Sequence, residues 1–333
     1  MIRCKDIAAI VGVSRQAVTA VLNNSRPNCV SPEKREEILA VAARHHYRPN
    51  HAAFALKTGK SNLIGIVMPS WDNPYVAELC MGLQQNLAAR NYTPLFTIDN
   101  NYNPVPGNLE QLLSLNVGGI ISVAASLLPD DIDIPAVSYY YDDPRFDSVC
   151  PNFKEQARLV ISYLHECGHR KIGYFGSLND QRIPYWISES ERCGLEFRES
   201  WRIESVGDDP ADAFDRLLKK NCNSELPSAL IVYYDALAQR LMCRIRERGF
   251  RIPEDFSIIS HDNISSDAYS FPALTSVSSG APGRIADTMI QLLINRIKDP
   301  GCPRKKVLLD PELIKRESVL VTAQKTNLRE IEK

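Results

Sequence analysis

The sequence predicts a small N-terminal helix-turn-helix domain followed by a large α/β body made of two doubly wound parallel-sheet lobes. Three observations predict this arrangement: a pair of short helical patterns near the N-terminus, a change in the sign of the charge after residue 60, and an alternation of strand and helix patterns from residue 61 onward. At 333 residues the chain is too long for one ordinary hydrophobic core, which agrees with such a division.

The helical pair lies in residues 3–23, RCKDIAAIVGVSRQAVTAVLN. Gly12 permits a tight turn between the helices, and Ser14 is a natural N-cap for a second helix over 15–22. The side chains expected to face the core are Ile7, Ala8, Ile10, Val11, Ala17, Val18, Val21 and Leu22. Such a pair forms a helix-turn-helix, whose second helix offers its first residues to the major groove of DNA. An ordinary helical hairpin remains an alternative for the pattern taken alone.

A third helix is expected from Pro32 to about His46, because Ser31 is a good N-cap and proline is tolerated at the first helical position. Its expected apolar face is Ile38, Leu39, Val41 and Ala42. The three helices give a DNA-binding domain over 1–49. Residues 50–60 are either a plain linker or a hinge helix that folds only when DNA and a partner subunit hold it, since so short a helix is unstable alone.

The charge is unevenly divided along the chain. Residues 1–60 hold ten Lys and Arg against four Asp and Glu, a balance of +6, whereas the rest holds 29 against 36, a balance of −7. A basic head is attracted to a phosphate backbone through counterion release. The net charge of −1 for the whole chain therefore conceals a segment suited to double-stranded DNA.

Composition argues against several other classes of protein. The nine cysteines are scattered with no CxxC pair, so neither a zinc site nor a disulfide framework is expected, and we expect reduced thiols in a cytoplasmic protein. No apolar run approaches the ~18 residues of a membrane span, and no secretory leader precedes the first helix. Catalytic and phosphate-binding motifs such as GxSxG, HExxH, GxGxxG and the P-loop are absent. We therefore expect no enzyme, no catalytic residue, no metal, no cofactor and no membrane partner.

The body alternates strand-like runs with amphipathic helical stretches, which favours parallel doubly wound sheets. The expected strands are 63–68, 93–98, 119–123, 136–140, 171–176, 229–234 and 256–260, and the expected helices include 75–90, 155–166, 236–248 and 285–297. In open α/β sheets ligands bind at the carboxyl ends of the strands.

Several motifs together resemble the lactose-repressor (LacI/GalR) family of bacterial transcriptional regulators, from residue 3 to about residue 320. They are KDIAAIVGVSRQAVTAVLN, YRPNHAAFALKTGKS, LIGIVMPSWDNPYVAEL, LHECGHRKIGYFG, ERGFRIPEDFSIISHDN and FPALTSV. The resemblance implies a sequence-specific repressor that binds a pseudo-palindromic operator as a homodimer. It also implies a periplasmic-binding-protein-like body over 61–320, with a small-molecule effector, sugar-like or a related metabolite, between its lobes.

The resemblance also implies boundaries. One lobe is expected at about 61–155 with 281–300, and the other at about 156–280 with 301–320. The dimer interface is expected on helices 73–90 and 282–297. Residues 321–333 are a polar tail without the leucine repeat of a tetramerising coiled coil.

Positions that contact DNA in the family can be transferred to this chain. Arg15 and Gln16 would read the major groove, and Leu56 of the hinge would wedge into the minor groove. The residues expected to contact the DNA backbone are Ser14, Thr19, Asn23, Tyr47 and Asn50. The chain has Thr19-Ala20 where the family commonly has Ser-Arg, so its operator should differ there from the common family consensus.

Seven effector-binding positions are expected in the cleft: Trp71, Asn73, Tyr75, Tyr139, Glu191, Tyr234 and Asp262. Glu191 stands where the family often has an effector-clamping arginine. An aromatic and acidic lining suits a sugar ring or a cation and does not suit a carboxylate or phosphate. The tyrosines could instead pack between the lobes. A solute-binding or sugar-processing protein is the alternative function, but the basic head and the lack of a leader argue against it.

Overall fold

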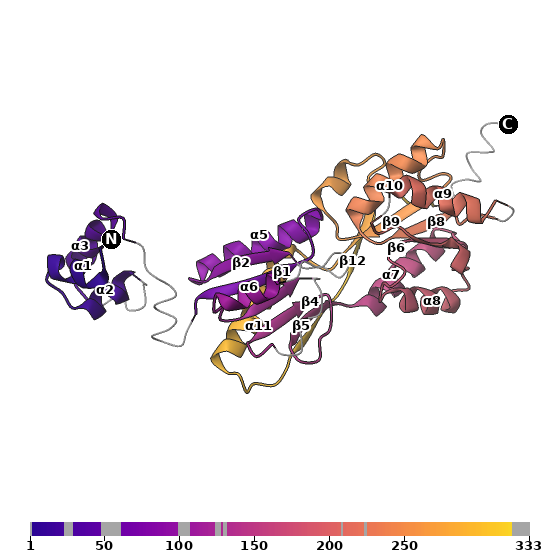
Figure 1. Cartoon of the computed structure of the whole chain (residues 1–333). Helices are drawn as coiled ribbons and strands as arrows, with labels where there is room; N and C mark the ends of the chain where they lie inside the picture. Colours follow the sequence, from indigo (N-terminus) through magenta and orange to yellow (C-terminus); the bar gives the residue numbers. More distant parts are fainter. Residues whose placement is uncertain are drawn as a thin grey trace. The chain divides into compact units, whose positions relative to one another are not determined.

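The computed structural model describes residues 2–22, 29–47, 61–98, 107–123, 128, 132–207, 209–222 and 225–321 (Figure 1). The chain divides into two compact units between Asn62 and Leu63. Among the described residues, no helix combines the length and the apolar character needed to cross a membrane.

The N-terminal unit contains three helices, α1 (Cys4–Val11), α2 (Arg15–Leu22) and α3 (Pro32–Arg44). Gly12 ends α1 with a φ of 70°, a left-handed conformation that glycine adopts without strain. The core of this unit consists of Ile7, Ala8, Val11, Val18, Val21, Ile38, Val41 and Ala42. The helix-turn-helix prediction is thus confirmed by the packing.

The prediction that two further residues face the core of this unit was wrong. Ile10 is 54% exposed and Leu39 is 44% exposed. Each lies next in sequence to a core residue, and a step of one residue turns a side chain by about 100° around the helix. The third helix also ends at Arg44, two residues before the expected end at His46.

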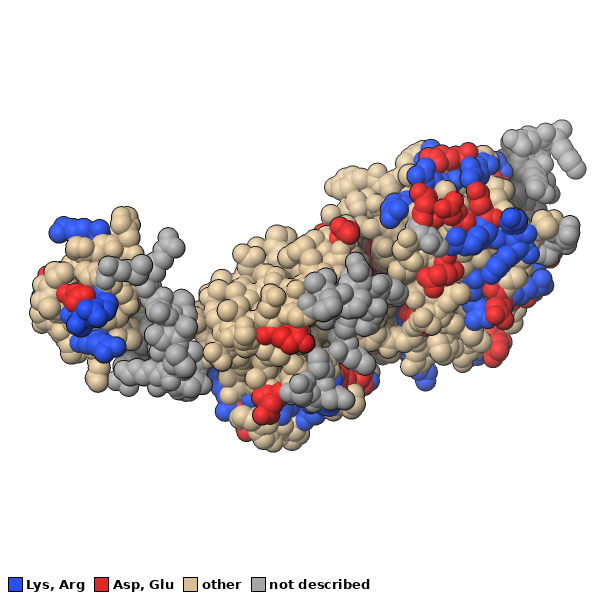
Figure 2. All heavy atoms as spheres, viewed as in Figure 1, with Lys and Arg blue, Asp and Glu red and all other residues tan. Residues whose placement is uncertain are grey.

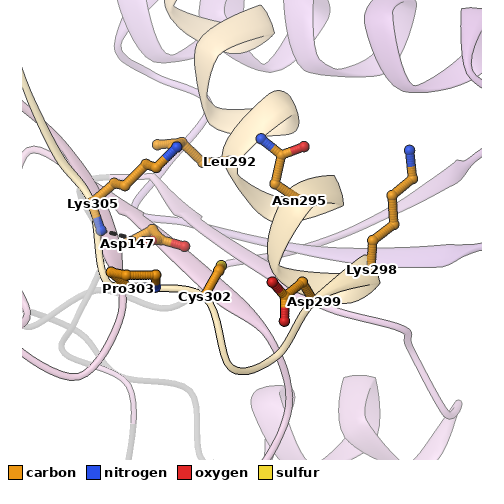
Figure 3. A pocket seen from close by; sticks show the side chains of 8 residues that line it. All are labelled: Asp147, Leu292, Asn295, Lys298, Asp299, Cys302, Pro303 and Lys305. Carbon is orange, nitrogen blue, oxygen red and sulfur yellow. Dashed lines mark hydrogen bonds between the residues drawn. The ribbon is translucent and has the colours of Figure 1, made fainter.

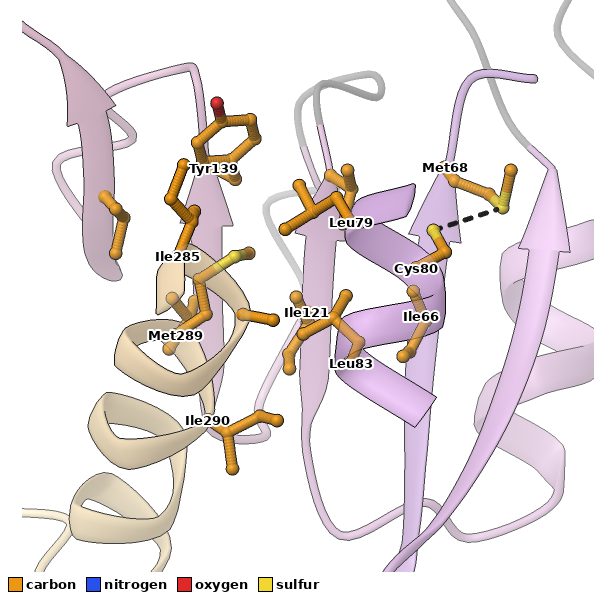
Figure 4. Packing of buried hydrophobic residues seen from close by; sticks show 14 of the residues in the cluster. Ile66, Met68, Leu79, Cys80, Leu83, Ile121, Tyr139, Ile285, Met289 and Ile290 are labelled. Carbon is orange, nitrogen blue, oxygen red and sulfur yellow. Dashed lines mark hydrogen bonds between the residues drawn. The ribbon is translucent and has the colours of Figure 1, made fainter. Parts of the chain in front are cut away.

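The first lobe of the body is built on a parallel sheet in the order β11-β5-β4-β3-β1-β2. Its strands are β1 (Leu63–Met68), β2 (Thr93–Ile98), β3 (Ile120–Val123), β4 (Ala136–Tyr139), β5 (Asp147–Pro151) and β11 (Lys306–Leu309), and its helices are α5 (Pro74–Ala89), α6 (Asn108–Ser114) and α11 (Pro282–Lys298). Figure 4 shows Leu79 and Leu83 of α5 beside Ile285 and Met289 of α11, over the sheet. A Cβ on Gly82 would lie 3.1 Å from the Gly283 Cα, so these two helices approach closely.

The second lobe repeats this plan, with the sheet order β12-β10-β9-β8-β6-β7 and only β12 antiparallel. Its strands are β6 (Ile172–Gly176), β7 (Arg202–Glu204), β8 (Ala229–Val232), β9 (Ser257–His261), β10 (Thr275–Ser278) and β12 (Glu312–Ile314). Its helices are α7 (Phe153–Glu166), α8 (Ile183–Arg192), α9 (Pro210–Lys220) and α10 (Asp235–Glu247), with short 3-10 turns η1 (Glu199–Trp201) and η2 (Ser265–Tyr269). Helices α7 and α8 cover one face of this sheet, and α9 and α10 cover the other.

The chain passes between the lobes three times, from β5 to α7, from β10 to α11 and from β11 to β12. The last passage corrects the assignment of 301–320 to the second lobe. β11 pairs with β5 in the first sheet, and only β12 pairs with β10 in the second. β11 is half-exposed in an alternating pattern, and its place in the first sheet depends on tertiary contacts rather than on its own sequence.

A buried ion pair fixes the start of β5. The Arg296 guanidinium of α11 donates to both oxygens of the Asp147 carboxylate, at 3.0 and 3.1 Å. The Lys305 backbone N–H donates to the same carboxylate at 2.6 Å, which ties β11 to it (Figure 3). A surface cavity of about 300 Å³ lies beside Asp147, lined also by Asn295 and Cys302.

Replacing Arg296 by methionine should lower the free energy of unfolding by about 3 kcal/mol or more, because it leaves the Asp147 charge buried without its partner. Chemical denaturation measures the change. Arg158→Met is the matched control, since Arg158 pairs with Glu155 at the surface and its loss should cost about 1 kcal/mol or less. Equal losses in the two variants would contradict the assignment of Arg296 as a structural anchor.

Candidate functional sites

The first turn of α2 is the candidate DNA-reading surface of the N-terminal unit. Ser14, Arg15 and Gln16 are all exposed. The Ser14 hydroxyl accepts a hydrogen bond from the Ala17 N–H at 3.1 Å, so it caps the helix as the sequence predicts. Arg15 and Gln16 are therefore presented to solvent at the helix N-terminus, where a helix-turn-helix reads bases.

Two of the expected backbone-contacting residues lie on the edge of this surface. Thr19 donates its hydroxyl to the Arg15 carbonyl at 2.9 Å, and the Tyr47 hydroxyl lies 2.9 Å from the Cys4 Sγ. Burial, together with the contact to Cys4, raises the pKa of Tyr47 to about 12, so the phenol keeps its proton. Asn23, Asn50 and Leu56 lie outside the described residues, and their roles stay predictions.

A cleft of about 560 Å³ lies between the two lobes of the body, where the carboxyl ends of both sheets meet. This volume is in the range of small-molecule sites in proteins. Six tyrosines contribute to its lining: Tyr75, Tyr139, Tyr140, Tyr141, Tyr233 and Tyr234. The polar lining includes Asp72, Asn73, Gln156, Arg182, Arg240, His261, Asp262 and Ser279.

The wall from the first lobe is held by Asn73 and two tyrosines. The Asn73 side-chain oxygen accepts from the Tyr75 N–H at 2.9 Å and so caps α5. The hydroxyls of Tyr75 and Tyr139 hydrogen-bond with each other, and both side chains are buried in the core of the lobe. These two tyrosines therefore have a packing role, and each also lines the cleft.

The wall from the second lobe is centred on Arg182, the residue before α8, whose side chain is only 4% exposed. Its Nε donates to Asp180 at 2.8 Å, and its Nη2 donates to the Tyr233 carbonyl at 2.8 Å. The guanidinium also lies over the Tyr233 ring, 4.7 Å from its centroid. Tyr174 donates to the same Asp180 carboxylate, so the position of Arg182 is fixed from two sides.

Asp262 follows β9 and lines the cleft with a φ of 113°, a region that residues other than glycine rarely adopt. Its N–H donates to the Val277 carbonyl at 2.9 Å, which holds the backbone in place. Burial raises the pKa of the carboxyl to about 7, while the Arg182 guanidinium and a hydrogen bond with Asn73 oppose that rise. Strained backbone at a ligand-facing acid is a feature typical of functional sites.

Behind this wall two further carboxyls, Asp235 and Asp267, are completely buried. Asp235 accepts from the Ser276 hydroxyl at 2.8 Å and from the Ile264 N–H at 3.2 Å, and Asp267 accepts from Gln239 at 2.8 Å. The Asp267 Oδ2 has no donor among the described residues except a protonated Asp235 carboxyl beside it. Burial raises the pKa of both groups, so one proton is shared between them.

Two expected effector residues lie away from the cleft. Trp71 is 49% exposed and packs against Phe96, and it does not line the cleft. Glu191 is exposed in the last turn of α8, far along the helix from the strand ends. Two cationic side chains line the cleft instead: Arg182, at the start of the same helix, and Arg240 of α10. The other five expected residues, Asn73, Tyr75, Tyr139, Tyr234 and Asp262, line the cleft.

Known proteins share both parts of this architecture. Residues 3–50 match the model of the bacterial regulatory proteins of the lacI family, and residues 161–319 match a periplasmic binding protein-like domain. The transcriptional repressor PurR of Pasteurella multocida is 28% identical over 96% of this chain and 99% of its own length. PurR of Erwinia tasmaniensis is 29% identical over 96% of the chain and 97% of its length. The chain therefore has a DNA-binding domain of the lacI family followed by a periplasmic-binding-protein-like domain.

Solved structures agree with the fold of this chain. A lac repressor dimer bound to operator and the anti-inducer ONPF superposes with a TM-score of 0.77 at 21% identity, covering 96% of this chain and 99% of that one. The regulator CelR in complex with cellobiose superposes with a TM-score of 0.66 at 21% identity, covering 96% and 100%. The chain is therefore a DNA-binding transcriptional regulator rather than an enzyme.

The proton shared by Asp235 and Asp267 predicts how the stability of this regulator depends on pH. Since the folded pKa values of Asp235 and Asp267 are raised above the ordinary 3.8, the folded state keeps a proton that the unfolded chain loses, and stability falls as pH rises above about 4. Asp267→Asn removes one carboxylate and supplies an amide donor to Asp235. We expect its melting temperature to fall less than that of the parent between about pH 5 and pH 8.

Asp287→Asn is the control for that measurement, because Asp287 is half-exposed on α11. It should keep the pH slope of the parent. A parent and an Asp267→Asn variant with the same slope would exclude a shared proton at this pair.

Proposed function

We propose that this regulator is a repressor that binds a pseudo-palindromic operator as a homodimer and is modulated by a small molecule in the cleft. The observation that carries the proposal is the exposed first turn of α2, where Arg15 and Gln16 face solvent rather than the core of the N-terminal unit. The same chain also has a separate cleft large enough for a small molecule. A regulator of operator DNA acts where the DNA is, so we assign it to the cytoplasm. The hinge role of Leu56 is part of the same proposal.

Support for a homodimer comes from α5. This helix carries Glu78 as its only charged residue, and Met81 on its surface is 55% exposed. Figure 2 shows that the visible face of the first lobe over α5 is mostly free of Lys, Arg, Asp and Glu. A low charge density with exposed methionine is typical of the centre of a protein interface. The two-fold symmetry of such a dimer would match two operator half-sites.

Operator selection from a random DNA pool, followed by binding assays, tests the reading surface. Arg15→Ala and Gln16→Ala should each relax the preference at one or two base pairs by about 1–3 kcal/mol, because each removes a contact to base edges. Arg44→Ala is the control, since Arg44 is exposed on α3 and its loss should weaken binding equally at all sequences. Unchanged preferences in both α2 variants would refute the assignment.

Sedimentation of the full chain tests the dimer surface. Met81→Glu should weaken dimerisation at least about tenfold, which is roughly 1.4 kcal/mol, because a buried unpaired charge replaces an apolar contact. Leu115→Glu is the matched control, since Leu115 is 54% exposed elsewhere on the first lobe. A Met81→Glu protein that stays as dimeric as the control would place the interface on another surface.

A further inference from the structure

A cysteine joins the three helical segments of the N-terminal unit at the edge of the DNA-reading surface. Cys4 is the first residue of α1, Thr19 lies on α2, and Tyr47 follows the end of α3. The Cys4 Sγ lies 2.9 Å from the Tyr47 hydroxyl oxygen and 4.0 Å from the Thr19 hydroxyl oxygen. All three side chains are half-buried, and those of Cys4 and Tyr47 pack against the apolar core. Cys4 therefore contacts two residues expected to bind the DNA backbone, although it is not itself expected to bind DNA.

Backbone contacts place Tyr47 beside the first residue of α2. The Tyr47 N–H donates to the Ala42 carbonyl at 2.8 Å, and the preceding His46 has a φ of 49°, a left-handed conformation that turns the chain at the end of α3. Burial has the largest effect on the pKa of Tyr47 and raises it, while the charge of Arg15 acts in the opposite direction. The Arg15 guanidinium therefore lies near the phenol, and an anionic group of DNA that it attracts would approach the phenol oxygen too.

The hydrogen bonds of this cluster leave one polar hydrogen without an acceptor. The Tyr47 phenol keeps its proton, and a cysteine thiol can either donate or accept. The contact between Cys4 and Tyr47 uses one of their two hydrogens. The Thr19 hydroxyl has an acceptor of its own, the Arg15 carbonyl at 2.9 Å. When the thiol donates to the phenol oxygen, the phenol O–H is left to donate outward, and no other described residue accepts it.

A phosphate oxygen of DNA is the acceptor that suits this O–H group. It is anionic and can only accept, so a hydrogen bond to it is stronger than one to a neutral sulfur. A phenol that is held in place before binding also loses less conformational freedom when DNA arrives. We propose that Cys4 is a positioning residue for DNA binding, whose thiol holds the Tyr47 phenol so that its O–H donates to a phosphate oxygen. This inference rests on the proposed function and adds to it a residue that does not touch the DNA.

The test is binding of the full chain to an operator selected from a random DNA pool. Tyr47→Phe should weaken binding about tenfold, because it removes a hydrogen bond to a charged group. Cys4→Ala should weaken it by about threefold to tenfold, because the phenol is no longer held in place. Cys4→Ser should recover most of the affinity, since a hydroxyl can donate in the same way. Cys4→Val, which keeps apolar packing but cannot donate, replaces Cys4→Ala if the smaller side chain destabilises the unit.

A double substitution separates a positioning role from a merely structural one. If Cys4 acts through Tyr47, adding Cys4→Ala to Tyr47→Phe should cause no further loss of affinity. Single operator phosphates replaced by neutral methylphosphonates give a second readout. The parent should lose affinity at one phosphate of each half-site, and that loss should disappear in Tyr47→Phe. Cys29→Ala is the matched control, since Cys29 is the other cysteine of the N-terminal unit and is exposed, and it should bind like the parent.

Three outcomes would overturn the inference. Unchanged binding by Cys4→Ala would mean that the thiol does not position the phenol. Unchanged binding by Tyr47→Phe would mean that the phenol O–H does not reach a phosphate, and additive losses in the double variant would mean that Cys4 acts without Tyr47. In each case the parent still binds its operator, so the proposed function stands. A parent that selects no DNA sequence would instead refute the proposed function, and this inference with it.

Discussion

The buried carboxylate of Asp235 holds the segment on which the cleft depends. It accepts hydrogen bonds from the Ser276 hydroxyl and the Ile264 N–H, and so fixes the loop that follows β9. The Ile264 side chain, from the second lobe, is buried in the apolar cluster of the first lobe together with Tyr75 and Tyr139. Asp262, two residues before Ile264, thereby faces the cleft with its left-handed backbone. One buried acid therefore sets both the contact between lobes and the position of a lining carboxyl.

The polar groups around this loop reduce stability where they are not fully paired. Asp235 and Asp267 are buried and share one proton, and the buried Nε2 of His261 has no donor among the described residues. Apolar residues of the same shape at these positions would make the folded state more stable. The large apolar clusters of the two sheets offset this. Within the body, the sheet cores therefore supply the stability, and the strand ends supply the groups for recognition.

The sequence predicts most of the hydrophobic strands well, but it misses strands that are polar, short or incompletely buried. β1 and β2 lie where the hydrophobic runs place them, and β8 and β9 lie within two residues of their expected bounds. β5 was missed because its first residues, Asp147 and Ser148, are polar, and Arg296 and Lys305 satisfy Asp147 only after the chain has folded. The edge strands β7, β11 and β12 are short and incompletely buried, so their sequences carry little signal.

The two candidate sites also differ in how far the sequence predicts them. Ser14, Arg15 and Gln16 lie in one helical turn, so local rules suffice to predict their exposure. The cleft is assembled from eight separate strand ends and turns, and its polar centre was assigned to the wrong end of α8. Arg182 was missed because its burial depends on Asp180 and Tyr174. No spacing in the sequence indicates that this arginine, rather than a residue later in α8, is drawn into the cleft.

Helix α5 joins the cleft to the proposed dimer surface. Asn73 caps it and Tyr75 lies in its first turn, and both line the cleft, while Met81 lies on its exposed face two turns later. The close approach of Gly82 to Gly283 fixes α5 against α11, so the helix cannot shift without moving its neighbour. A ligand that moved Asn73 or Tyr75 would therefore act on the helix that carries the proposed dimer surface.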